Sequence, residues 1–133
     1  MEIRQFRVVI RAKHYDRTCR FYGEALALPR LQSWEHEDAR GTLFQAGSAV
    51  LEVRGRAAAA SGEGPLKWDE VYDYQGPEQK LVLVLVVPSA EKAYEEIFFR
   101  EKNIPGGLRK DVDGTLIFET HDPDGLKVVC REG

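Results

Sequence analysis

Short stretches rich in strand-forming residues give way to helical spacing along this chain, and the same order occurs twice. In the first half, residues 6–12 include the β-branched run Val-Val-Ile, which is typical of a strand. Residues 16–26 form a predicted helix with Asp16 as its N-cap and with one stripe of residues four positions apart, namely Thr18, Tyr22 and Leu26. Residues 41–54 indicate a hairpin centred on a Gly-Ser turn.

The second half repeats this order. Residues 80–87 are predicted to form a strand, and Ser89 is expected to cap a helix with an apolar stripe of Ala90, Ala93, Tyr94, Ile97 and Phe98. Residues 114–119 and 126–131 are expected to close the chain as a hairpin. They are joined by the sequence Asp-Pro-Asp-Gly at 122–125, which is typical of a tight turn.

The two halves also share sequence details. Gly41-Thr42-Leu43 returns as Gly114-Thr115-Leu116, and a tyrosine stands on each predicted helix. Such self-similarity predicts a duplicated fold of the α+β class. A chain of 133 residues is typical of a single domain. We expect module one at about 1–56, a linker at about 57–79 and module two at about 80–133.

Composition narrows the possible partners and the compartment. The 19 basic and 22 acidic residues give a formal net charge of −3, so we expect no nucleic-acid partner. The longest apolar run, 81–88, is far short of the roughly 20 residues that a membrane helix needs, so we expect no membrane partner. Cys19 and Cys130 are too few for a disulfide framework, and they are predicted as small core residues of a cytoplasmic protein.

Three motifs carry a resemblance to a known family. Phe21-Tyr22 stands on the first predicted helix with Leu26 behind it, Val50-Leu51-Glu52-Val53 ends the first hairpin, and Asp-Pro-Asp-Gly precedes the final strand. In this duplicated frame the chain resembles the vicinal oxygen chelate superfamily, which includes glyoxalase, extradiol dioxygenases and bleomycin-resistance protein. The resemblance implies two tandem βαβββ modules that form a cup-shaped mixed sheet with helices on the outer face. It also implies a homodimer.

The same resemblance places the family's four metal-ligand positions on Arg7, Glu52, Val82 and Val129. Only Glu52 could bind a divalent ion, because valine has no lone pair and a guanidinium stays protonated. One carboxylate does not hold a catalytic metal. We therefore expect no metal, no cofactor and no catalytic residue, and the chain contains no motif typical of an activated nucleophile.

Strand alternation suggests where a ligand would bind. Arg7, Val9 and Arg11 share one face of the first strand, and Glu52 lies on the mixed face of its own strand. We hypothesise that Arg7 and Glu52 form an ion pair where the family holds its metal; the alternative is that both are solvated surface residues. The predicted ligand pocket comprises Arg7, Val9, Arg11, Trp34, Phe44, Glu52, Trp68, Val82, Val84, Phe118 and Val129.

Two tryptophans lie in stretches interpreted as connections. Trp34 lies in a polar segment and Trp68 in the linker, where either could stack on a ligand or fold back onto the domain. The sequence favours a metal-independent binding protein that sequesters an amphiphilic or aromatic organic molecule. Two alternatives stay open: a metal-dependent lyase, isomerase or dioxygenase of the same superfamily, and a structural or regulatory module without a ligand.

Overall fold

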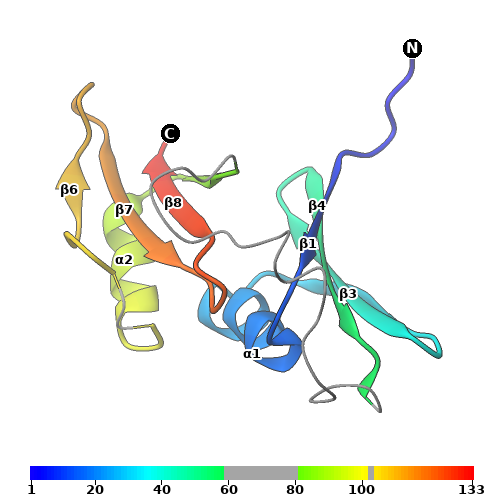
Figure 1. Cartoon of the computed structure of the whole chain (residues 1–133). Coiled ribbons are helices and arrows are strands. Elements are labelled where there is room, and N and C mark those ends of the chain that lie inside the picture. The colour runs from blue at the N-terminus through cyan, green and yellow to red at the C-terminus, as the bar shows by residue number, and fades with distance from the viewer. Residues whose placement is uncertain (59–80, 102–103) are drawn as a thin grey trace. The chain divides into compact units, whose positions relative to one another are not determined.

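The computed structural model describes residues 1–58, 81–101 and 104–133 (Figure 1). These residues form two compact units, one containing the described residues up to 58 and the other containing those from 81 onward. Nearly all of the predicted linker, 57–79, and all of Trp68 lie outside the described residues.

The first unit is a four-stranded mixed sheet with one helical segment. Its elements are β1 (Arg7–Arg11), α1 (Tyr15–Arg20), the π-helical turn η1 (Phe21–Ala25), β2 (Arg30–Glu35), β3 (Ala39–Ala46) and β4 (Ala49–Arg56). The strand order is β1-β4-β3-β2, in which β1 runs parallel to β4 and the other pairs are antiparallel. The predicted hairpin is the β3–β4 pair, in which Ala46 faces Ala49.

The second unit repeats the arrangement, with a longer helix and with three of its four strands shorter. They are β5 (Leu83–Val87), α2 (Ala90–Phe98), β6 (Arg109–Lys110), β7 (Leu116–His121) and β8 (Lys127–Glu132), in the strand order β5-β8-β7-β6. The Ser89 hydroxyl accepts a hydrogen bond from the Lys92 amide at 3.2 Å, which confirms the predicted cap of α2. The α+β prediction with two tandem βαβββ modules is confirmed.

Each core forms where an apolar sheet face meets the helix of its own unit. In the first unit Ile10, Phe44 and Val53 are fully buried, and Gly55 lets the helix approach the sheet. A Cβ atom at Gly55 would lie 2.7 Å from the Cβ of Tyr15. In the second unit the ring of Phe118 lies 5.5 Å from that of Tyr94 on α2. Helix burial on one face leaves the other sheet face available for polar chemistry.

The two cysteines are core residues, as predicted. Cys19 lies on α1 and Cys130 on β8, and both are buried. Burial raises the pKa of the Cys130 thiol to about 11, so this group is neutral at physiological pH. Cys130 therefore packs as a small apolar side chain.

Two local predictions were wrong. Helix α1 begins at Tyr15, so Asp16 lies inside its first turn, and the N-cap is His14 without a side-chain hydrogen bond. The segment around Trp34 is not a connection but strand β2, an edge strand that is exposed at almost every position. An edge strand with little burial has no need for apolar alternation, which is why its pattern resembled a loop. Among the described residues, no helix is both long and apolar enough to cross a membrane.

The turn between β7 and β8 provides a test of the fold. Asp122 is 4% exposed, and its Oδ1 accepts hydrogen bonds from the amides of Asp124 and Leu126, both at 2.9 Å. We expect Asp122→Ala to lower the free energy of unfolding by about 1–3 kcal/mol, because the Leu126 amide loses its acceptor. Asp122→Asn keeps a carbonyl oxygen in place and should lose clearly less in urea unfolding. Equal losses in the two variants would show that these hydrogen bonds do not stabilise the turn.

Candidate functional site

The face of the first sheet that points away from α1 carries a buried carboxylate between two arginines. Glu52 on β4 is 1% exposed, whereas the side chains of Arg7 and Arg54 are 40% and 43% exposed. Arg7 Nη1 donates to Glu52 Oε1 at 2.9 Å, and Arg54 Nε donates to Glu52 Oε2. The predicted Arg7–Glu52 contact is therefore present, and Arg54 completes a triad that the sequence reading had not identified.

Strand register explains why these three side chains meet. Val9 on β1 pairs with Glu52, which places Arg7 diagonally beside it, and Arg54 follows Glu52 two residues later on the same face. On the other side Leu43 faces Glu52 across the β3–β4 ladder. The carboxylate thus lies between apolar neighbours and needs its two guanidinium partners to offset the loss of water.

Arg7 and Arg54 differ in whether their other guanidinium N–H groups form hydrogen bonds. Arg7 also donates from Nε and Nη2 to Gln5 Oε1, at 3.0 and 2.8 Å. Arg54 has no acceptor for its two terminal nitrogens among the described residues. Two cations around one carboxylate leave one excess positive charge, and Arg54 presents the donors that remain available.

Trp34 lies beside Arg54 because its indole ring can lie close to Gly41 on β3. Trp34 pairs with Gly41, and Gly41 pairs with Arg54, so all three share the open face of the sheet. A Cβ atom at Gly41 would lie 2.5 Å from the indole, so only glycine lets the ring lie this close to β3. The guanidinium carbon of Arg54 stands 5.4 Å from the ring centroid, within cation–π range.

The second sheet presents a different open face. Val82 and Val84 are exposed, and Val84 pairs with Val129 on β8. Glu119 pairs with Val129 from the other side and forms ion pairs at 3.6 Å with Arg109 and Lys127. The predicted Val84 and Val129 are thus neighbours in the second sheet, Val82 stands just before β5, and Glu119 beside Val129 lacks the short contacts of Glu52.

Phe44 and Phe118 were predicted in the ligand pocket, but they lie in the cores. Both are completely buried, and each is on the sheet face that packs against the helix of its unit. Phe44 is close to the η1 backbone, since a Cβ atom at Gly23 would lie 2.9 Å from its ring. Aromatic residues on short strands can lie on either face, and the register decides which. Arg11 and Val9, by contrast, are exposed on the predicted face.

The sequence matches a known protein family over almost its whole length. Residues 4–129 match the family model described as the Glyoxalase/Bleomycin resistance protein/Dioxygenase superfamily. The chain belongs to this superfamily.

Solved structures of similar fold agree. The structure of SMU.1112c has a TM-score of 0.75 at 20% identity, over 96% of each chain. A mutant of glyoxalase I from Zea mays has a TM-score of 0.73 at 19% identity, over 96% of this chain and 46% of that one. The glyoxalase family protein from Enterococcus faecalis has a TM-score of 0.68 at 24% identity, over 98% and 97%. No curated protein has a significantly similar sequence. At these identities the likeness shows the fold alone.

Metal-dependent members of the Glyoxalase/Bleomycin resistance protein/Dioxygenase superfamily need carboxylate or imidazole donors, and the implied positions here do not fit an ion. Both oxygens of Glu52 already accept from guanidinium groups. Arg7 has no lone pair to donate, and the positions in the second sheet are valines. Within the described residues, no three His, Cys, Asp or Glu side chains come together in a way that could hold a metal.

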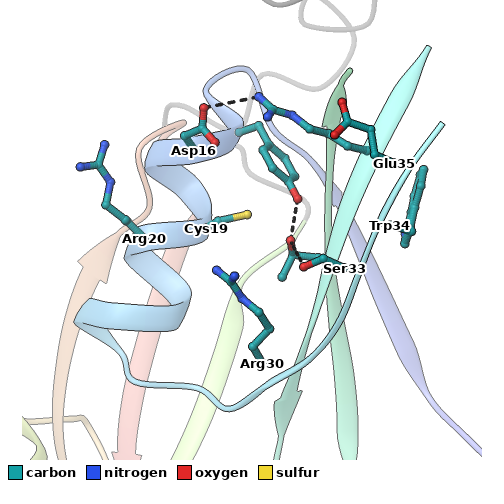
Figure 2. Close-up of a pocket in the computed structure, with 10 residues that line it drawn as sticks. Asp16, Cys19, Arg20, Arg30, Ser33, Trp34 and Glu35 are labelled. Carbon is teal, nitrogen blue, oxygen red and sulfur yellow. Dashed lines mark hydrogen bonds and ion pairs between the residues drawn. The ribbon is translucent and has the colours of Figure 1, made fainter. Parts of the chain in front are cut away.

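A pocket on the helix-facing side of the first sheet was missed altogether. It has a volume of about 550 Å³ and lies between α1 and the strands β2 and β3 (Figure 2). Its lining includes Tyr15, Cys19, Arg30, Ser33, Arg40 and Thr42. No motif links these residues in the sequence, because the path of α1 across the sheet brings them together.

The triad provides a stability test with a matched control. We expect Glu52→Gln to lower the free energy of unfolding by about 1–3 kcal/mol, since two adjacent guanidiniums lose the charge between them. Added salt should recover part of this loss by screening the Arg7–Arg54 repulsion. Glu119→Gln removes a carboxylate with longer ion pairs and should cost less than about 1 kcal/mol. Equal, salt-independent losses would contradict a dominant role for the triad.

Proposed function

We propose that this protein binds a small organic molecule that carries an anionic group on a flat apolar body, and that it does so without a metal ion. The observation that carries the proposal is the position of Arg54. Its Nε is held by the buried Glu52, its terminal nitrogens have no acceptor among the described residues, and its guanidinium lies over Trp34. A guanidinium oriented in this way is suited to a planar carboxylate.

Charge and shape support this ligand class. The triad of Arg7, Glu52 and Arg54 has an excess positive charge, and Arg11 lies beside Arg54 in the adjacent strand. Trp34 is held close to the backbone by Gly41 and offers an aromatic surface next to these donors. A ligand with an acidic group and a flat body would use both features.

Two other functions are kept as alternatives because of the family. A metal-dependent lyase, isomerase or dioxygenase would need donors that the triad does not leave available. A structural or regulatory module without a ligand does not require hydrogen-bond donors of Arg54 beside the aromatic ring of Trp34. Ligand sequestration therefore remains the function that the first sheet supports best.

Metal content is the first measurement. We expect the purified protein to contain no stoichiometric divalent metal by elemental analysis. We also expect Mg²⁺, Mn²⁺, Fe²⁺, Ni²⁺ and Zn²⁺ to leave its melting temperature unchanged, because Glu52 has no free oxygen. One tightly held ion per chain, with a clear rise in melting temperature, would overturn the metal-independent proposal. Sedimentation of the same samples tests the predicted homodimer.

Ligand binding is tested with a charged probe and its neutral counterpart. By calorimetry we expect naphthalene-2-carboxylate to bind more tightly than naphthalene-2-carboxamide. Arg54→Gln should weaken the carboxylate about tenfold, the equivalent of about 1.4 kcal/mol. Arg131→Gln is the control, since Arg131 on β8 already pairs with Asp111 at 3.0 Å. Equal binding of the two probes, or equal losses in the two variants, would contradict the proposal.

A further inference from the structure

The pocket between α1, β2 and β3 has a second and separate set of polar groups. Ser33 on β2 pairs with Thr42 on β3, and Thr42 pairs with Val53. Glu52 and Arg54 flank Val53 in β4, so strand alternation puts Ser33 and Thr42 on the opposite face of the sheet from the triad. The hydroxyl groups of the pocket and the triad therefore lie on opposite faces of the sheet, although Trp34 lines the pocket as well as standing beside Arg54.

Three hydroxyl groups form a short chain in this pocket. The Tyr15 hydroxyl lies 2.5 Å from Thr42 Oγ1, and Ser33 Oγ lies 3.1 Å from the same atom (Figure 2). Each hydroxyl has one hydrogen to donate. Cys19 also hydrogen-bonds with Tyr15 and Thr42, so the exposed Ser33 hydroxyl at the end of the chain is the group that can meet a ligand oxygen. Burial raises the pKa of Tyr15, so its hydroxyl keeps its proton at neutral pH.

Arg30 supplies the charge of the pocket. Its side chain extends from the start of β2 toward Cys19 and Ser33 (Figure 2). Arg30 has no acidic partner among the described residues, and its guanidinium lies 5.9 Å from the Phe44 ring. Arg40, in contrast, is engaged: it stacks over Tyr15 at 4.2 Å and pairs with Asp16 at 3.4 Å. Arg20 also lines the pocket, but it extends from α1 away from β2 and β3 (Figure 2), so Arg30 is the cation directed toward the hydroxyl groups.

The buried thiol of Cys19 favours non-covalent binding in this pocket over covalent chemistry. Its thiol faces the hydroxyl trio (Figure 2), and the residue is 6% exposed. Burial raises the pKa of this thiol, so it is not a thiolate at neutral pH. The pocket thus offers neutral hydroxyl groups beside the Arg30 guanidinium, with no activated nucleophile among its described lining residues.

We propose that this pocket is a second ligand site, in which Arg30 binds the carboxylate of a small polar organic acid and the Tyr15–Thr42–Ser33 hydroxyl trio binds a second oxygen of the same molecule. Its volume of about 550 Å³ is within the usual range for small-molecule sites. The carboxylate accepts two hydrogen bonds from the planar guanidinium, and the exposed Ser33 hydroxyl forms a hydrogen bond with a hydroxyl or carbonyl oxygen of the ligand.

The test uses 3-hydroxybutyrate as the probe and follows amide resonances of the full chain by NMR. We expect saturable shifts that map to residues 15–20, 30–35 and 39–42, and none of similar size for 3-hydroxybutyramide. Arg30→Gln should weaken binding about tenfold, because a charge-assisted pair is lost. Arg17→Gln is the matched control, since Arg17 is exposed on α1, does not line the pocket and makes the same charge change.

Three further measurements decide the assignment. Arg54→Gln should leave the probe affinity unchanged, which separates this pocket from the triad site. Ser33→Ala should lower the affinity for 3-hydroxybutyrate more than that for butyrate, because only the former has the second oxygen. Arg30→Gln should keep the native melting temperature, since Arg30 is exposed. The proposal is overturned if the shifts map elsewhere, if Arg30→Gln and Arg17→Gln bind alike, or if inorganic phosphate binds as tightly as the carboxylate.

Discussion

A carboxylate removed from water must be neutralised by its neighbours, and the first sheet is organised around this requirement. Glu52 is almost completely buried between apolar side chains of β1 and β3, and each of its oxygens accepts from an arginine. Burial of the acid alone would cost several kcal/mol. The pairing therefore determines the positions of Arg7 and Arg54, and through Arg54 it determines what the open face presents above Trp34.

The two faces of this sheet consequently differ in chemistry. The open face carries an ion cluster beside an aromatic ring, held by the register of β1, β4 and β3. The helix-facing side is apolar at its centre, where Ile10 and Val53 are buried, and polar near the β2 edge, where Tyr15, Ser33 and Thr42 meet. Helix α1 is short and covers only part of this face, so a pocket remains between α1 and the strands β2 and β3.

A metal ion and a guanidinium group interact with a ligand in different ways. A divalent ion binds a ligand oxygen strongly and can polarise it, whereas an arginine supplies oriented hydrogen bonds and charge. The structure places guanidiniums at the only carboxylate among the implied ligand positions. Membership of the Glyoxalase/Bleomycin resistance protein/Dioxygenase superfamily describes the fold of this chain, and fold alone does not supply its chemistry.

Several features followed from local sequence. Strand alternation placed Arg7, Val9 and Arg11 on the exposed face, because a period of two is imposed by the strand itself. The Arg7–Glu52 contact was expected from the metal-ligand positions that the family resemblance implies, and it is present. The duplicated order of elements predicted two similar sheets, and both are present. Predictions failed where burial did not shape the sequence, as in the exposed edge strand β2, and where a bulky residue could face either way, as for Phe44 and Phe118.

The sequence by itself thus determined the repeat, the strand faces and the lack of metal donors at Val82 and Val129, since these depend only on residue type and periodicity. Only the tertiary structure decided that Arg54 completes the triad, that Trp34 lies over Gly41, and that Tyr15, Arg30 and Thr42 line one pocket. These contacts depend on the pairing register of separate strands and on the path of α1 across them. Residues that are far apart along the chain come into contact in this way, and no local sequence pattern predicts these contacts.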